Sequence, residues 1–354
     1  MSDPHTTLQT GLTRRSLLQS MAATGMAGLL PNVLFGAASR DSAESPDFQG
    51  VLEFVDGEFA AKTLPGALLA VTHRRKLVLE KSWGTYCSRT ERTVPCDSQM
   101  VNMCYSVSKL IASTVVVIAQ QKGMFDYDTP VSKYIPEFQG GGKDTITVRH
   151  LLTHSAGLPS VPLKAVDSPA KWQTAVATLC AAKVEWEPGS KSVYHGLTGH
   201  FLAAEVVRRC SANKPWEDLC HELLFDPIGA KSLTYQVPPA SVPVAGTPMP
   251  VEGAYNIAGF NDGIAGHPAG GALGTASDLL KVLHLHLNDG EWDGKRLIDP
   301  EALRQMHTVQ YAAQIDAAIQ AGKPPAYDAW GLGILLRGPG PARGGHGWFG
   351  LSEV

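Results

Sequence analysis

The chain has 354 residues, with 30 Lys and Arg residues against 33 Asp and Glu residues and a formal net charge of −3. This balance excludes a strongly basic nucleic-acid-binding protein by bulk composition and excludes a strongly acidic protein as well. Hydrophobic residues make up 44% and charged residues 18%, and the 36 Gly and 24 Pro residues indicate many loops, so the composition fits a globular enzyme and excludes a disordered chain or a coiled coil.

The first predicted element is an export signal over residues 1–38. Arg14-Arg15 precedes a weakly apolar run, Leu17–Phe35, and small residues follow at Gly36–Ala38, a pattern that resembles a bacterial twin-arginine signal. Glycines and polar residues interrupt the run, so it lacks the ~18 uninterrupted apolar residues of a membrane-spanning helix. We therefore expect a periplasmic or secreted mature chain of residues 39–354 without a stable membrane anchor. A disordered N-terminus with a chance arginine pair is the alternative.

Six cysteines follow in the mature chain, and an exported location would permit disulfides. Sequence does not choose among their possible pairings, and only Cys87 and Cys96 are close enough in the chain to suggest a local pair. Because no C-x-x-C is present, zinc-ribbon and thioredoxin-like interpretations have no support.

Hydrophobic periodicity predicts one continuous domain without repeats. The expected elements, in chain order, are a helix at Phe48–Lys62, a β-hairpin at Gly66–Thr72 and Leu77–Trp83, an apolar helix at Ser106–Gln121, and further helices near Gly199–Arg209, Pro215–Leu224, Ser277–Leu287 and Pro300–His307. Two other segments stand out: Val237–Pro250, which holds five prolines and is expected to be an extended loop, and Trp330–Arg337, which is expected to be a strand.

Several motifs point away from other enzyme classes. Gly345–Gly350 matches G-x-G-x-x-G, but only four residues follow it, so the helix that would face a dinucleotide pyrophosphate is not present in the sequence. His150 and His154 have the spacing of zinc ligands, but without H-E-x-x-H they are better explained as residues of a turn or of the core. No G-x-S-x-G nucleophile elbow occurs.

The remaining candidate motif is S-x-x-K, which occurs at Ser106, Ser168 and Ser211. Only Ser106-Val107-Ser108-Lys109 opens a strongly apolar helix. Residues at i and i+3 share a helix face, with Cβ atoms about 5–6 Å apart, so the lysine amine can reach the serine hydroxyl. A serine needs such a base to become a nucleophile, and lysine can act as one when desolvation lowers its pKa. The alternative is that Ser106 caps the helix and Lys109 is solvated.

Several ordered blocks of the chain resemble the serine β-lactamase and penicillin-binding-protein superfamily, specifically its class C-like branch of esterases and D-amino-acid peptidases. The most distinctive block is Ile146-Thr147-Val148-Arg149-His150-Leu151-Leu152-Thr153-His154-Ser155-Ala156-Gly157-Leu158. The others are Tyr105–Lys109, Gly123–Glu137, Glu187-Pro188-Gly189 followed by Tyr194, and Gly270–Leu279.

The resemblance implies an α+β fold of the β-lactamase/transpeptidase type, in which an antiparallel sheet is flanked by helices and joined to an all-helical region. The sheet region would comprise about 47–104 and 265–354, and the helical region about 105–264. In that family more strands and a C-terminal helix follow the third catalytic motif, whereas this chain stops at Val354. We therefore expect the sheet to be truncated and the protein to be marginally stable or inactive unless something compensates.

The resemblance also implies the catalytic roles. Ser106 would be the acylated nucleophile, Lys109 would take its proton or tune its neighbours, and Tyr194 would be the general acid/base, with a phenol made usable by an adjacent Lys109 cation. The oxyanion would lie between the Ser106 N–H and an N–H near Trp348 or Phe349.

Two departures from the family pattern affect the expected substrate. Tyr194-His195-Gly196 lacks the asparagine amide that would bind a β-lactam acylamide, and it resembles the esterase and transesterase members instead. The third motif is His346-Gly347-Trp348, in which a neutral histidine attracts a substrate carboxylate less than lysine would.

The leading hypothesis is an exported serine hydrolase that acts through an acyl-enzyme on small esters or amides, without a metal or nucleotide cofactor. The alternatives are a β-lactamase or D,D-peptidase, and a non-catalytic, penicillin-binding-like module that recognises peptidoglycan-like or acyl ligands without turnover. The acyl group, the leaving group and the oligomeric state stay open.

Overall fold

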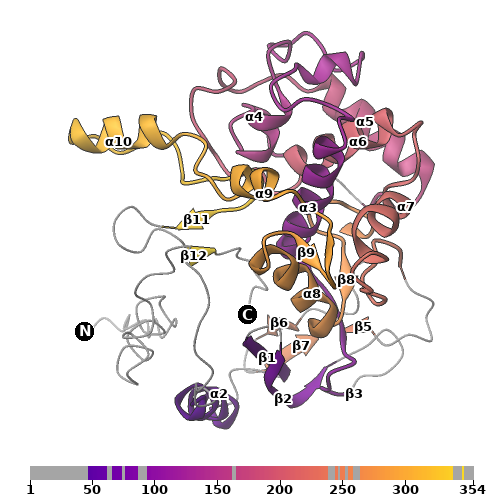
Figure 1. Cartoon of the computed structure of the whole chain (residues 1–354), viewed down its shortest axis with the longest axis vertical. Helices are drawn as coiled ribbons and strands as arrows, with labels where there is room; N and C mark the ends of the chain where they lie inside the picture. Colours follow the sequence, from indigo (N-terminus) through magenta and orange to yellow (C-terminus); the bar gives the residue numbers. More distant parts are fainter. Residues whose placement is uncertain are drawn as a thin grey trace, which may run out of the picture.

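The computed structural model describes the chain from residue 47 to residue 346 with internal gaps. The described residues are 47–61, 66–73, 76–86, 94–161, 165–237, 244–245, 248–251, 254–257, 264–337 and 345–346. Helices combine with small, mostly antiparallel sheets, which confirms the α+β class (Figure 1). The expected export signal and Cys87 lie outside the described residues, so both stay predictions.

The N-terminal part is a helix followed by a hairpin, as expected. Helix α2 spans Gln49–Ala60, and strands β1 (Gly66–His73) and β2 (Lys76–Tyr86) pair antiparallel, with β3 (Val94–Pro95) beside β2. A glycine is required at Gly66, because a Cβ there would lie 2.5 Å from a backbone oxygen of β2.

A second small sheet leads directly to the candidate nucleophile. Strand β4 (Val101–Met103) pairs parallel with β5 (Val244–Ala245) and antiparallel with β8 (Leu273–Gly274). A single 3₁₀ turn, η2 (Tyr105–Val107), joins β4 to helix α3 (Ser108–Gln121). The chain therefore passes from a sheet strand into the central helix at Ser106.

Helix α3 forms the centre of the helical region. Its Thr114–Val117 stretch is β-branched and has low intrinsic helix propensity, but Ile111–Ala119 are all buried, so tertiary packing stabilises the helix. Helix α3 ends at Gln121, and Gly123 follows with φ +75°, a left-handed conformation that favours glycine.

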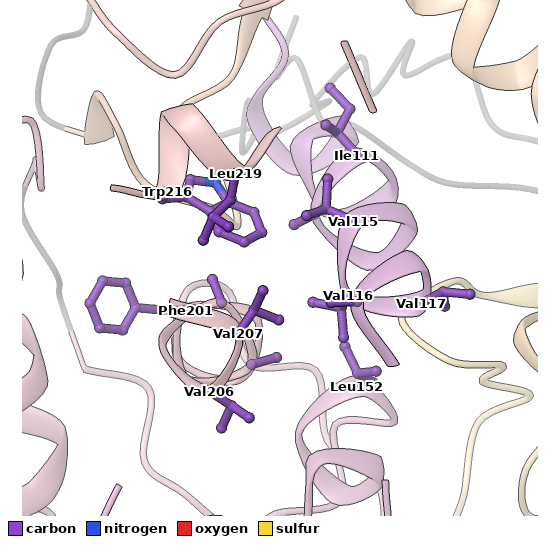
Figure 2. Close-up of a cluster of buried hydrophobic side chains, with 14 of the residues drawn as sticks. Ile111, Val115, Val116, Val117, Leu152, Phe201, Val206, Val207, Trp216 and Leu219 are labelled. Atoms are coloured by element: carbon purple, nitrogen blue, oxygen red, sulfur yellow. The ribbon is translucent and has the colours of Figure 1, made fainter. Parts of the chain in front are cut away.

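Shorter helices form the rest of the helical region, some packed directly on α3 and others on its neighbours. They are η3 (Val131–Lys133), α4 (Val148–Leu152), α5 (Pro169–Ala181), α6 (Thr198–Cys210), α7 (Trp216–Cys220) and the π-helical turn η4 (His221–Phe225). Figure 2 shows Val115 and Val116 of α3 on the side facing α6, with Leu152 of α4 and the apolar residues of α7 beside them, and Val117 pointing away from α6. This cluster is the main hydrophobic core.

The rest of the described chain forms three further helices and several short strands. Its elements are β6 (Pro248–Val251), β7 (Ala254–Ile257), α8 (Ala276–Leu287), β9 (Glu291–Trp292), β10 (Lys295–Arg296), α9 (Pro300–Met306), α10 (Ala312–Gln320), β11 (Leu336–Arg337) and β12 (Gly345–His346). Helix α10 has no buried residue and projects from the body (Figure 1). None of the helices in the described part of the chain is both long and apolar enough to cross a membrane.

The structure corrects several expected elements. The segment Val237–Pro250 is not one extended loop, because it contributes β5 and the start of β6. Within Trp330–Arg337 only the last two residues form a strand, β11. Helix α5 was not expected, although Ser168 caps it by accepting a hydrogen bond from the Lys171 N–H and a proline follows at its first position.

We predict that Phe201→Ala destabilises the fold by about 3–5 kcal/mol, because it removes a large, fully buried side chain that packs on Trp172 of α5 in the main core. The matched control is Leu287→Ala on α8, whose side chain is 72% exposed and whose loss should change stability by about 0.5 kcal/mol or less. Urea unfolding of both variants measures the difference, and equal midpoints would contradict the assigned core.

Candidate active site

The backbone around Ser106 adopts an unusual local conformation. Ser106 lies in the 3₁₀ turn η2 before helix α3, not in the first turn of the α-helix as expected. Tyr105 has φ 41°, a left-handed conformation that is rare for an aromatic residue. No side chain caps η2 or α3, so the alternative interpretation of Ser106 as a helix cap is wrong.

The Ser106 hydroxyl instead contacts both other predicted catalytic side chains. Its Oγ lies 2.8 Å from the Tyr194 hydroxyl and 3.1 Å from Lys109 Nζ. Lys109 Nζ also donates to the carbonyl of Ala269 at 2.9 Å, and it lies 5.2 Å from the centre of the Tyr194 ring. The structure therefore brings Ser106, Lys109 and Tyr194 together around one oxygen atom.

Lys109 is fully buried at the start of helix α3. Its desolvation lowers the pKa of the amine from 10.5 to about 7, because a buried cation loses its hydration. A substantial share of Lys109 is therefore neutral near pH 7, and a neutral amine can accept the Ser106 proton. The three-residue spacing was visible in the sequence, but the depth of burial was not.

The pKa of the Tyr194 phenol differs from the expectation. Tyr194 is 44% exposed, although its hydroxyl contacts the Ser106 hydroxyl. Partial burial raises the pKa of its phenol and outweighs the opposing effect of its hydrogen bond with Ser106. The expected lowering of this pKa by Lys109 is thus not what the structure shows, and Tyr194 is a neutral phenol near pH 7.

Two residues that sequence reasoning missed join the nucleophile helix to the block at 264–275. The buried Tyr235 hydroxyl donates to the carbonyls of Ser108 and Pro268 at 3.1 and 3.2 Å. Ser108 Oγ accepts a hydrogen bond from the Ala272 N–H at 3.0 Å. These bonds hold the Ala269 carbonyl beside Lys109. The second serine of Ser106-Val107-Ser108-Lys109 was the only sequence signal for this contact.

The two histidines of the distinctive block have structural contacts, as the resemblance implied. His150 Nδ1 accepts from the Thr147 N–H, and the Thr147 hydroxyl accepts from the His150 N–H, so the two residues cap helix α4. His154 is fully buried against Tyr194 and Trp330. Within the described ranges, no three His, Cys, Asp or Glu side chains are placed to hold a metal ion.

The predicted third motif is only partly described. His346 lies in β12, where its backbone pairs with Leu336 of β11. Gly347, Trp348 and Phe349 lie outside the described residues, so their place in an oxyanion site stays a prediction.

Comparison with known proteins decides the family. Residues 51–352 match the family described as Beta-lactamase. The chain belongs to the β-lactamase family. This is a family of serine hydrolases, and its members similar to this chain include esterases, β-lactamases and D-alanyl-D-alanine peptidases.

Three relatives illustrate this range within the β-lactamase family. The chain is 28% identical over 300 residues to the esterase/beta-lactamase LipL of Mycobacterium tuberculosis, covering 76% of this chain and 68% of LipL. It is 27% identical over 258 residues to the D-alanyl-D-alanine-carboxypeptidase/endopeptidase AmpH of Escherichia coli, covering 68% of this chain but only 62% of AmpH. The crystal structure of a family VIII carboxylesterase is similar, with a TM-score of 0.65 and 25% identity over 85% of each chain.

Proposed function

We propose that this protein is an esterase-like serine hydrolase that acts through an acyl-enzyme on small esters or amides. One observation carries the proposal: Ser106 Oγ lies within hydrogen-bond distance of both Lys109 Nζ and the Tyr194 hydroxyl. The buried Lys109, with a pKa of about 7, supplies the base that a serine nucleophile requires. The family match and the esterase relatives support the same chemistry.

In the first step, neutral Lys109 accepts the Ser106 proton while Oγ attacks the substrate carbonyl carbon. The tetrahedral intermediate then collapses, and the bond to the leaving oxygen or nitrogen breaks. The leaving group takes the proton from Lys109 through the Tyr194 hydroxyl, which lies 2.8 Å from Oγ and can pass a proton without becoming a stable phenolate. In the second step, water attacks the ester and the protons move in the reverse order.

The third residue of the Tyr194-His195-Gly196 motif favours an ester substrate over a β-lactam. His195 is 4% exposed, and its ring stacks on Trp186. Gly196, which stands where many β-lactamases carry asparagine, has no side-chain amide to bind the acylamide group. Val193 and Tyr194 are both exposed, so this part of the loop offers an apolar contact to the substrate.

A β-lactamase or D,D-peptidase is the second candidate, because LipL and AmpH carry those activities in their names. A substrate panel separates the candidates: p-nitrophenyl esters of two to eight carbons, nitrocefin, and a peptide ending in D-Ala-D-Ala. We expect the short esters to give a kcat/KM at least about 100-fold above that of nitrocefin, which corresponds to about 2.7 kcal/mol of transition-state discrimination.

Faster turnover of nitrocefin or of the peptide would overturn the esterase assignment. Binding of these ligands without an acyl adduct on Ser106 in intact-mass spectrometry would instead support a non-catalytic binding module.

We propose further that the protein is exported through its Arg14-Arg15 signal. The support is the order of the arginine pair, the weakly apolar run and the small residues at Gly36–Ala38. Cell fractionation of the full chain and of the variant with Arg14→Lys and Arg15→Lys tests this. We expect the variant to stay in the cytoplasm, and equal export of both chains would contradict the proposal.

A further inference from the structure

Both neighbours of Tyr194 in the chain are bound by one residue, His154. The Val193 N–H donates to the His154 carbonyl at 2.9 Å, and the His195 N–H donates to His154 Nδ1 at 3.2 Å. His154 is fully buried and has φ 55°, a left-handed conformation in which its carbonyl and its ring both reach the same loop. The loop that carries Tyr194 is thus fixed on either side of the phenol.

The His154 ring also forms part of the wall behind the phenol. Its centre lies 4.9 Å from the centre of the Tyr194 ring and 4.4 Å from that of Trp330. Trp330 lies nearly parallel to Tyr194, at 11° and 6.1 Å. These contacts limit how far the Tyr194 ring can rotate or shift, because a packed aromatic cluster has few alternative arrangements.

We propose that His154 is a positioning residue for Tyr194, and that its Nδ1 acceptor holds the phenol within hydrogen-bond distance of Ser106 Oγ. This assignment rests on the proposed function, because a positioned Tyr194 matters for turnover only if Ser106 is acylated. A misplacement of about 1 Å can cost an enzyme about a hundredfold in rate. Loss of this positioning residue should therefore lower kcat more than it changes substrate binding.

The bond to His195 requires a neutral imidazole, because Nδ1 must offer a lone pair. Burial is the main reason that the pKa of His154 lies well below 6.5, and the nearby His200, Lys109 and His195 lower it further. Nδ1 therefore accepts the hydrogen bond from the backbone while Nε2 carries the ring proton.

The chemistry of the acceptor suggests a pair of matched variants. In His154→Asn, Oδ1 is bonded to Cγ as Nδ1 is in histidine, so it can accept the same hydrogen bond, and asparagine tolerates a left-handed backbone. In His154→Leu the acceptor is lost while apolar bulk is kept. His154→Gln is the second test, because its acceptor lies one bond further out and misses the His195 N–H.

We expect His154→Leu and His154→Gln to lose about 10- to 100-fold in kcat for p-nitrophenyl acetate with little change in KM. We expect His154→Asn to stay within about threefold of the wild type in kcat, even though the lost ring packing lowers its melting temperature. Equal losses in all three folded variants, or no loss in any, would overturn the proposal.

A readout independent of turnover separates this inference from the proposed function. Crystal structures of the wild type and the variants give the distance from Ser106 Oγ to the Tyr194 hydroxyl, which is 2.8 Å here. We expect that distance to be kept in His154→Asn and to exceed hydrogen-bond range in His154→Leu or His154→Gln. An unchanged distance in all variants would refute the positioning role, whereas a wild type without Ser106-dependent turnover would refute only the proposed function.

Discussion

Ser106→Ala is expected to lower kcat/KM for a p-nitrophenyl ester by at least about a thousandfold and to abolish labelling by a fluorophosphonate probe. The reason is chemical: the hydroxyl that contacts Lys109 and Tyr194 is the only atom placed to form the acyl bond in the proposed mechanism. Steady-state hydrolysis and intact-mass spectrometry of the labelled protein measure the two effects.

The matched control for this experiment is Ser211→Ala, which alters another S-x-x-K serine at the end of α6. We expect it to keep wild-type turnover and labelling. Labelling that persists in Ser106→Ala would show that another residue is the nucleophile.

Lys109→Met is expected to lower kcat/KM by a similar factor, at least about a thousandfold, because Ser106 loses its base. Methionine is an unbranched side chain of similar length, so it fills the buried site without a charge. The control is Lys171→Met, which changes the exposed lysine of the S-x-x-K at Ser168, where Lys171 pairs with Asp167, and which should leave turnover unchanged.

The pH profile of the wild type tests the role of Lys109 directly. The pKa of Lys109 is lowered to about 7, and the neutral form is the base, so kcat/KM should rise about tenfold per pH unit below pH 7 and level off above it. Because the pKa of Tyr194 is raised, its titration should not produce a second change in kcat/KM near pH 7. A profile that instead falls as the pH increases through 7 would mean that the Lys109 cation, and not its neutral amine, is the required form.

Local patterns accounted for much of the fold. The apolar run after Ser106 predicted helix α3, and the neighbouring segments Gly66–Thr72 and Leu77–Trp83 predicted the β1–β2 hairpin. Helix α4 and helix α10 were not predicted, because a five-residue helix is too short to show a period and α10 buries none of its residues. Strand β5 was not predicted, and strand β11 was predicted to be longer than it is. A strand of two residues is set by the strand it pairs with and is too short to show an alternation of its own.

The contacts of the candidate site also differ in how far the sequence could predict them. Ser106 and Lys109 are three residues apart, so the pitch of one helical segment is enough to bring the hydroxyl and the amine together, and the sequence alone determined that contact. Tyr194 is 88 residues from Ser106, and Ala269 is 160 residues from Lys109. Only the packing of distant segments decided that these groups meet around one oxygen.

The chemical state of the site also belongs to the tertiary structure. Whether Lys109 is a solvated cation or a base near pH 7 depends on how much water the surrounding helices exclude, and that exclusion is a property of the assembled core. The same holds for Tyr194, whose pKa rises because the loop held by His154 places the phenol partly out of water. The sequence determined which groups are available, and the folded chain determined their distances and their protons.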